Sequence, residues 1–71
     1  MNIEQGNYIL LNLAVKYIED VELIYEIKKI ISSPPPRVAI RGIFELINKN
    51  KTKEFTAEDK EMFDDLFYFF G

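Results

Sequence analysis

The chain has 71 residues, a formal net charge of −3, and neither cysteine nor histidine. This length supports a single domain, without disulfides and without the Cys or His ligands of a structural zinc site. The acidic balance argues against general binding to a nucleic-acid backbone, so the composition favours a small globular protein whose core comes from its 48% apolar residues.

The N-terminal part resembles neither a signal peptide nor a membrane span. A signal peptide begins with basic residues, whereas the one charged side chain among residues 1–5 is acidic. The most apolar stretch, residues 8–18, is interrupted by Asn12 and Lys16 and falls short of the ~20 residues that cross a bilayer. We therefore expect a cytoplasmic protein without a transmembrane segment, folded as a single helical domain over residues 1–71.

Apolar periodicity predicts two helices in the first half of the chain, over residues 8–18 and 21–31. The first helix has only a narrow polar strip, so it should be the most buried element, and Gly6-Asn7 looks like its upstream boundary. Asp20 is placed to cap the N-terminus of the second helix. The apolar periodicity is interrupted at Glu19-Asp20, which fits either two helices with a sharp joint or one bent helix. We favour the joint.

The triple proline at residues 34–36 is the clearest boundary, because no helix passes through three consecutive prolines. Pro36 is suited to open the next helix, predicted over residues 36–48. Gly42 lies in its interior at a cost of ~1 kcal/mol relative to Ala, which suggests close packing against a neighbour.

The fourth helix is predicted over residues 56–70, with Thr56 as its N-cap and Asp59 completing a capping box. Phe55 precedes the cap and can pack back onto the helix. Acidic residues cluster in the first half of this helix and aromatic residues in its last turns. Four short amphipathic helices with short connections predict an all-α fold, a small antiparallel four-helix bundle.

The charged clusters have ordinary explanations. The carboxylates near the start of the fourth helix suit an acidic first turn and a solvated face, and they lack the ligand spacing of an EF-hand loop. The lysines of the third loop, with Arg37 and Arg41 nearby, could contact phosphate or an acidic protein surface. The spacing of the elements does not fit a helix-turn-helix, so we expect no nucleic acid partner.

The aromatic tail of the fourth helix is the best candidate for an interaction surface. Most of its rings should belong to the core, but a terminal turn this aromatic is hard to cover completely, and exposed apolar patches mark contact sites. Tyr68 is the ring that we most expect to be exposed. The residues predicted to bind a protein partner are Lys49, Lys51, Lys53, Asp65, Tyr68, Phe69 and Phe70.

The sequence offers little for catalysis. Ser32 and Ser33 have no base paired with them by any recognisable pattern, and the isolated glycines form no phosphate-binding loop. We expect no enzymatic activity, no cofactor and no metal site. Formation of a homodimer would give so small a chain extra buried surface, and it remains an open alternative.

The second half of the chain resembles the enterocin A/pediocin-like bacteriocin immunity proteins. The features that carry the resemblance are the proline-led segment 36–44, the loop Asn48-Lys49-Asn50-Lys51, Phe55-Thr56, and a final helix containing Glu61 and Leu66. The resemblance implies a cytoplasmic four-helix bundle that protects a bacteriocin producer by stoichiometric binding to a bacteriocin-engaged membrane permease. The fourth helix and the lysine loop would then be the contact surface.

The chain departs from that family at its C-terminal end. Family members usually continue beyond the fourth helix into a segment that decides which bacteriocin is neutralised, so residues 66–70 would have to serve that role here. An alternative from another class is a phage or mobile-element regulator that binds a host protein through the acidic and aromatic fourth helix. A transcriptional regulator is the weakest alternative, because the chain is acidic.

Overall fold

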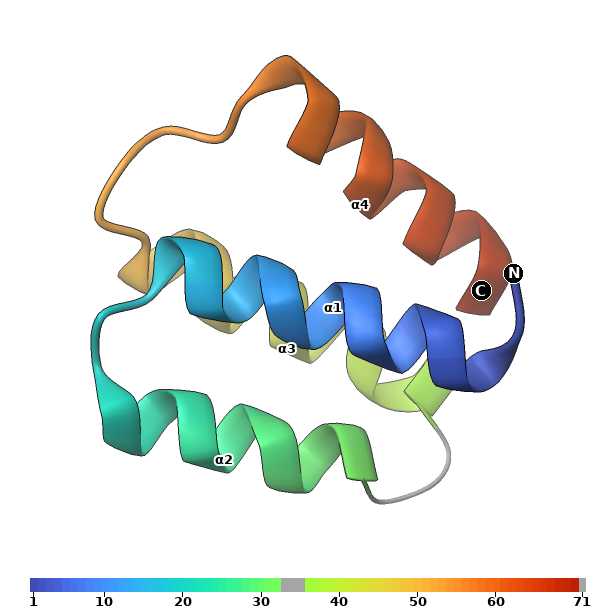
Figure 1. Ribbon diagram of the computed structural model, residues 1–71, viewed down its shortest axis with the longest axis horizontal. Coiled ribbons are helices and arrows are strands. Elements are labelled where there is room, and N and C mark those ends of the chain that lie inside the picture. The colour runs from blue at the N-terminus through green and yellow to red at the C-terminus, as the bar shows by residue number, and fades with distance from the viewer. Residues whose placement is uncertain (33–35, 71) are drawn as a thin grey trace.

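The computed structural model describes residues 1–32 and 36–70, with the side chains of residues 1–32 and 39–70. It contains helices α1 (Ile3–Tyr17), α2 (Val21–Ser32), α3 (Pro36–Asn50) and α4 (Ala57–Phe70). Successive helices run in opposite directions (Figure 1), which confirms the predicted all-α antiparallel bundle. Ser33, Pro34 and Pro35, on which the predicted boundary rests, lie outside the described residues.

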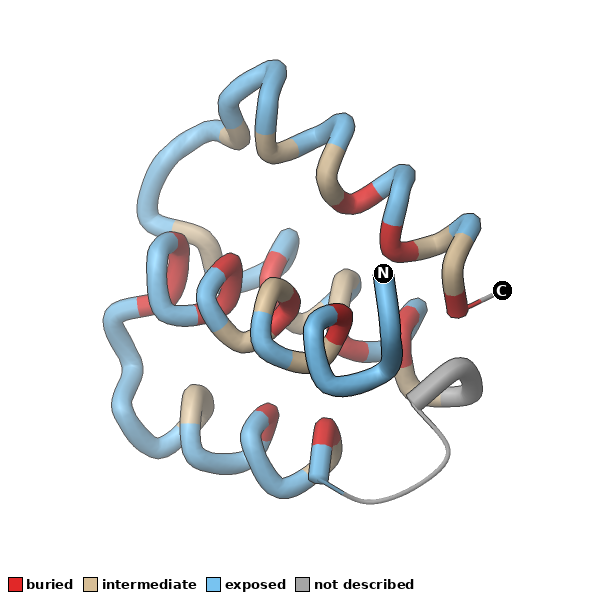
Figure 2. The backbone as a smooth tube through the Cα atoms, turned by 45° about the vertical axis from the view of Figure 1, so that its right-hand side comes forward, coloured by how far each residue is buried: buried red, intermediate tan, exposed pale blue. Residues whose placement is uncertain are grey.

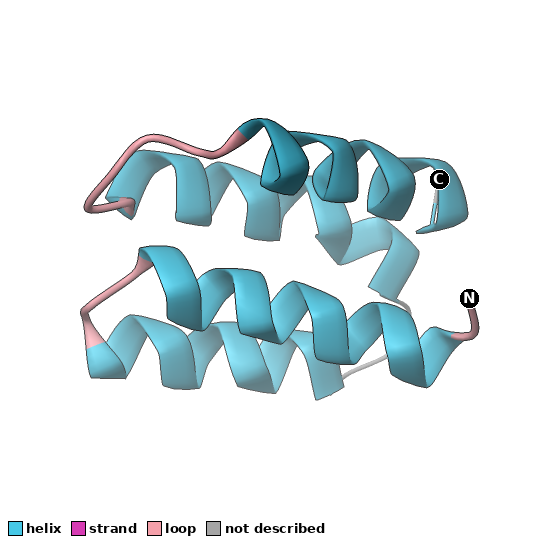
Figure 3. Ribbon diagram, turned by 45° about the horizontal axis from the view of Figure 1, so that its top comes forward, coloured by secondary structure: helices cyan, strands magenta, loops and turns pink. Residues whose placement is uncertain are grey.

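Helix α1 is central to the bundle. It contacts α2, α3 and α4, and α3 also packs against both α2 and α4, whereas α2 and α4 do not meet within the described residues. The α1–α2 and α3–α4 hairpins therefore stack on two levels (Figure 3). Buried positions on every helix lie on the side that faces the other helices (Figure 2). The largest fully buried side chains are Leu10, Tyr17, Ile27, Ile40, Ile43, Ile47, Phe63 and Leu66. No helix in the described part of the chain is both long enough and apolar enough to cross a membrane.

Helix α1 starts five residues earlier than predicted, at Ile3 rather than Tyr8. A capping box begins it: Asn2 Oδ1 accepts a hydrogen bond from the Gln5 N–H at 2.8 Å, and Gln5 Oε1 accepts one from the Asn2 N–H at 3.0 Å. The expected boundary at Gly6 is wrong, because this glycine lies inside the first turns of the helix. A Cβ atom added at Gly6 would lie 2.7 Å from Phe70 Cζ, so the glycine allows the C-terminal end of α4 to approach α1.

The predicted joint between α1 and α2 is present. Ile18 leaves the helix with an extended backbone, φ −111° and ψ 130°. Asp20 then caps α2 as expected: its Oδ1 accepts hydrogen bonds from the N–H groups of Glu22 at 3.0 Å and Leu23 at 3.3 Å. The two helices are separate elements that turn back on one another.

Helix α3 begins at Pro36 as predicted and extends to Asn50, two residues beyond the predicted end. The Asn50 side chain donates a hydrogen bond to the Leu46 carbonyl at 2.8 Å, which occupies one of the carbonyls left open at this helix end. The expected close packing at Gly42 is wrong. Gly42 is exposed, and a Cβ atom there would have no neighbour within 4 Å.

Candidate protein-binding surface

The lysine-containing loop between α3 and α4 is anchored on Tyr17, the last residue of α1. The Tyr17 carbonyl accepts hydrogen bonds from the Thr52 N–H at 2.9 Å and from the Thr52 hydroxyl at 3.3 Å. The Tyr17 ring meets the Phe55 ring edge-on, with centroids 4.7 Å apart. Thr52 is thus attached to the Tyr17 backbone and Phe55 to the Tyr17 ring, so one buried residue gives the loop a defined position on the bundle.

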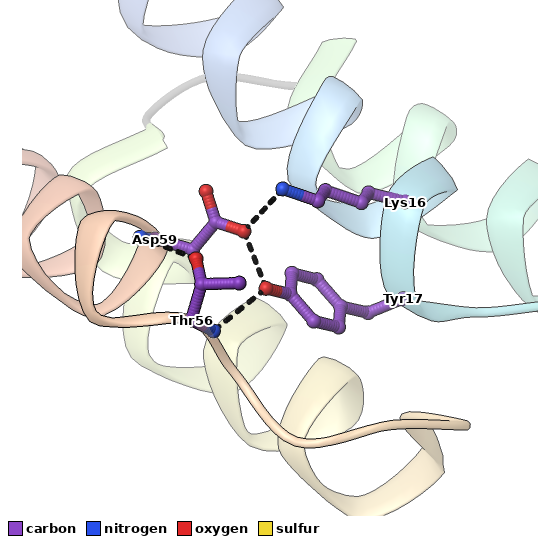
Figure 4. A network of polar contacts seen from close by, with 4 residues as sticks. All are labelled: Lys16, Tyr17, Thr56 and Asp59. Atoms are coloured by element: carbon purple, nitrogen blue, oxygen red, sulfur yellow. Dashed lines mark hydrogen bonds and ion pairs between the residues drawn. The ribbon is translucent and has the colours of Figure 1, made fainter.

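Tyr17 also completes the N-terminal cap of α4 (Figure 4). Thr56 Oγ1 accepts the expected hydrogen bond from the Asp59 N–H at 3.1 Å. The reciprocal half of the predicted capping box is different, because the Thr56 N–H donates to the Tyr17 hydroxyl at 3.1 Å instead of to Asp59. The Tyr17 hydroxyl in turn donates to Asp59 Oδ2, and Lys16 Nζ lies 2.7 Å from the same oxygen. The start of α4 is thereby tied to the end of α1.

This arrangement shifts two pKa values in opposite directions. The hydrogen bond from Lys16, followed by the one from Tyr17, holds the pKa of Asp59 below its ordinary value of 3.8. The Asp59 carboxylate raises the pKa of Lys16 above 10.5. Both groups are therefore charged at neutral pH, as their pairing requires. The Lys16 side chain remains 45% exposed, so solvent screens the ion pair and its main effect is to orient Asp59.

A concave pocket of about 370 Å³ lies where α3, the lysine loop and α4 meet. Its walls contain four phenylalanine rings, Phe44, Phe55, Phe63 and Phe67. Phe44 is at the centre of the group, with its centroid 4.9 Å from that of Phe63 and 5.2 Å from that of Phe67. The volume of the pocket is at the lower end of the range for ligand pockets. Because only Phe63 among the four is fully buried, the other rings offer apolar surface to an incoming group.

Charged side chains of both signs line this pocket: Lys51 and Lys60 are accompanied by Glu54 and Asp64. Lys51 Nζ lies 4.5 Å from the centroid of the Phe55 ring, donates a hydrogen bond to Asn48 Oδ1 at 2.9 Å and is 3.5 Å from Glu54 Oε2. The Arg41 guanidinium lies 5.3 Å from the centroid of the Phe67 ring. The Lys60 side chain, on the α4 side of the pocket, has no hydrogen bond or ion pair with the described residues. The two lysines and the two carboxylates of the lining balance in formal charge, and the Arg41 guanidinium adds a positive charge beside the Phe67 ring.

The structure places the three predicted lysines in different surroundings. Lys51 lines the phenylalanine pocket. Lys53 is exposed and its Nζ lies 5.6 Å from the centroid of the Tyr17 ring. Lys49 is exposed in the last turn of α3. The lysine loop thus presents a cationic edge to solvent, but only one of its lysines belongs to the pocket.

The predicted residues on α4 divide between surface and core. Tyr68 is 92% exposed, the largest value among the exposed large apolar side chains, as expected. Asp65 is also exposed and Phe69 is half-buried. Phe70 is only 4% exposed and packs against Gly6, so it belongs to the core that joins the two ends of the chain. A substitution at Phe70 would disturb folding before it tested binding.

The predicted contact residues form two groups rather than one patch. Helix α4 separates the lysine loop from Tyr68, and at 1.5 Å per residue the eleven steps from Ala57 to Tyr68 span ~16 Å. The loop and the aromatic end accordingly lie at opposite ends of α4 (Figure 1). A partner that touched both groups would have to lie along the whole length of this helix.

Sequence reasoning missed the residues that organise this region. Tyr17 and Lys16 looked like ordinary positions of a buried helix, and only the fold brings them to Asp59. The phenylalanine pocket was partly visible, because Phe55 was expected to pack onto α4; it does so at Phe63, with centroids 5.1 Å apart. No group of three or more Asp, Glu, His or Cys side chains within the described ranges is arranged to hold a metal ion.

Comparison with known proteins adds no relative. No protein-family model, no curated protein and no solved structure matches this chain.

Proposed function

We propose that this chain is a non-enzymatic protein-binding module whose contact surface includes the outer side of α4. The observation that carries the proposal is the exposure of Tyr68, which leaves an aromatic side chain almost wholly in solvent on a helix whose other large rings are half-buried or buried. Aromatic side chains of this kind frequently supply most of the energy of an interface. Asp65 lies one turn before Tyr68 and would add charge selectivity.

The chemistry of the described side chains supports binding rather than turnover. The two groups with shifted pKa values, Lys16 and Asp59, are paired with each other at the start of α4. Their arrangement holds two helices together and leaves the carboxylate engaged with Tyr17. Stoichiometric recognition of another protein needs only a stable surface, and the buried core beneath α4 supplies it.

The more specific form of the proposal is bacteriocin immunity. The resemblance of residues 36–66 to pediocin-like immunity proteins and the four-helix order support it. The chain would act from the cytoplasm and bind a membrane permease that a bacteriocin has already engaged. Its acidic and aromatic α4 would then be the specificity element, and the cationic edge of the lysine loop would make a second contact.

The test is co-precipitation from detergent-solubilised membranes of a bacteriocin-sensitive Gram-positive strain, with and without a pediocin-like bacteriocin. The tagged chain should capture the sugar permease only when the bacteriocin is present. Tyr68→Ala should lose that capture, because it removes the exposed anchor without touching the core. Tyr25→Ala is the matched control, since Tyr25 is an exposed tyrosine on α2, 58% accessible.

Two results would contradict the proposal at different levels. Capture of the permease without bacteriocin, or no capture under either condition, would exclude immunity of this class. Equal capture by wild type, Tyr68→Ala and Tyr25→Ala would exclude the outer side of α4 as the contact surface. Capture of a soluble host protein that depends on Tyr68 would instead support the alternative, a regulator that binds its target through the acidic and aromatic helix.

A further inference from the structure

The side of α1 that faces away from α3 is not covered by any helix of the described chain. In Figure 1, α2 and α4 lie on either side of α1 and α3 lies behind it, and α2 and α4 make no contact with each other among the described residues. Tyr8 and Val15 remain 68% and 55% exposed on this central helix, although both are large apolar side chains. We call this uncovered, partly apolar surface the open side of the bundle.

The apolar residues on the open side have the spacing of a helix–helix contact. Tyr8, Leu11 and Val15 are three and four residues apart, and at about 100° per residue they fall within about 60° of one another on α1. Leu11 is half-buried, whereas the other two side chains are exposed. Apolar residues at positions i, i+3 and i+7 are the pattern by which one helix packs along another. These three residues, here called the α1 stripe, therefore suit a partner helix that lies along α1.

Helix α4 borders the open side with carboxylates. Glu58 contributes to the raised pKa of Lys16 on α1, which places its carboxylate on the side of α4 next to that helix. Asp65 lies seven residues further along α4 and therefore on the same side, which also carries the half-buried Met62 and Phe69. Neither carboxylate has an ion pair or a side-chain hydrogen bond in the described part of the chain. This edge of the open side is therefore acidic and partly apolar.

The lysines near this edge do not neutralise it. Lys16 is already paired with Asp59, and Lys60 lines the phenylalanine pocket on the α3 side of α4. On α1 itself, Glu4 lies one turn before Tyr8, is exposed and has no ion pair among the described residues. Helix α2, at the opposite edge, carries two glutamates and two lysines and is neutral in formal charge. The charges around the open side therefore favour a cationic partner.

We propose that the open side of the bundle binds a cationic amphipathic helix of a partner protein, which lies along α1. Its apolar side packs on the α1 stripe, and its lysine or arginine side chains lie opposite Glu58 and Asp65. The bound helix covers the side of α1 that the bundle leaves exposed, which is the helix-in-groove mode of recognition. The proposal does not rest on the function proposed above, because it uses α1 and leaves Tyr68 outside the contact.

The experiment measures binding of a fluorescein-labelled helical peptide to the purified full chain by fluorescence anisotropy. The probe has leucine at the seam positions of successive heptads, lysine at the flanking positions and alanine elsewhere. It should bind saturably at micromolar concentrations of the chain, and its affinity should fall as the salt concentration rises. A peptide of the same composition in shuffled order, and one with glutamate in place of lysine, should each bind about tenfold more weakly or worse.

Substitutions on the α1 stripe test where the peptide binds. Tyr8→Ala should weaken binding about tenfold, because it removes the aromatic contact, and Val15→Lys should weaken it at least as much by placing a charge in the apolar seam. Gly42→Lys is the control for the added charge, since it introduces a lysine on α3 at a position where a Cβ atom meets no neighbour within 4 Å. Tyr68→Ala is the control for an exposed tyrosine, and both controls should bind as wild type does. Circular dichroism of each variant reports whether the fold is intact.

Several results would overturn the proposal. They are the absence of saturable binding, equal binding of the patterned and shuffled peptides, and equal weakening by Val15→Lys and Gly42→Lys or by Tyr8→Ala and Tyr68→Ala. Sedimentation equilibrium of the chain without peptide adds one more, because a dimer that Tyr8→Ala dissociates would assign the open side to a second copy. Peptide binding that survives Tyr68→Ala, beside permease capture that does not, would separate this surface from the one proposed above, so each proposal can fail alone.

Discussion

Tyr17 illustrates how one residue can connect two halves of a small protein. Its side chain is fully buried, yet its hydroxyl reaches the first turn of α4, where it accepts from the Thr56 N–H and donates to Asp59. A tyrosine is suited to this position because it fills core volume and ends in a group that both donates and accepts a hydrogen bond. Phenylalanine would fill the same volume but leave the Thr56 N–H without its partner.

We therefore expect Tyr17→Phe to lower the free energy of unfolding by about 1–3 kcal/mol, the cost of leaving a partly buried polar group without its hydrogen bond. Urea unfolding followed by circular dichroism measures the change. Tyr8→Phe is the control, because Tyr8 lies on the same helix with 68% of its surface exposed; its effect should stay within about 0.5 kcal/mol. Equal effects of the two substitutions would show that the Tyr17 hydroxyl contributes nothing to the docking of α4.

At the scale of the helices, the two interior glycines have opposite roles that the sequence does not distinguish. Gly42 lies in open space on α3, whereas Gly6 lies on α1 directly under the Phe70 ring. Glycine in a helix interior costs about 1 kcal/mol relative to alanine, because it loses more backbone freedom on folding. That cost is offset by a tertiary contact at Gly6, and no neighbour offsets it at Gly42.

Alanine substitutions at the two glycines should consequently change stability in opposite directions. Gly42→Ala should raise the free energy of unfolding by about 1 kcal/mol, since the new methyl group meets nothing. Gly6→Ala should lower it, because displacing the Phe70 ring from a packed site costs ~1–3 kcal/mol and exceeds the propensity gain. Midpoints of urea unfolding compare the two variants. Stabilisation by Gly6→Ala would mean that the end of α4 moves aside easily and does not pack firmly on α1.

The elements most open to sequence prediction were those with strong local signals. The Asp20 and Thr56 caps, Pro36 and the apolar periodicity predicted all four helices and most of their ends. The start of α1 was missed because Gly6 was interpreted as a boundary, although the Asn2 and Gln5 pair was a readable capping signal. The binding surface was harder to predict, because Tyr17, Phe44 and Phe55 come together only through contacts between residues far apart in the chain.

For the whole molecule, the polar connection between the α1–α2 hairpin and α4 makes stability depend on pH. Asp59 forms an ion pair with Lys16 only while it is ionised, and the hydrogen bond that it accepts from Tyr17 is strongest in that form. Lys16 forms the ion pair only while it is protonated. The pKa of Asp59 is lowered on folding, so its contribution is present above its ordinary value of 3.8 and is lost as the pH falls through the folded value. The pKa of Lys16 is raised, so its contribution is present below 10.5 and is lost as the pH rises through the folded value.

Substitution of Asp59 should therefore change the pH dependence of stability in acid, and substitution of Lys16 should change it in alkali. Asp59→Asn should reduce the loss of stability in acid, and Lys16→Met should reduce the loss in alkali, while both lower stability at neutral pH. Urea unfolding at a series of pH values gives the slopes, and Asp64→Asn is the control, since Asp64 has no ion pair among the described residues. An acid slope that Asp59→Asn and Asp64→Asn reduced equally would mean that general charge repulsion, rather than the tie between α1 and α4, governs acid unfolding. A slope changed by Asp59→Asn alone would place the acid sensitivity of the bundle at the start of α4, beside the phenylalanine pocket.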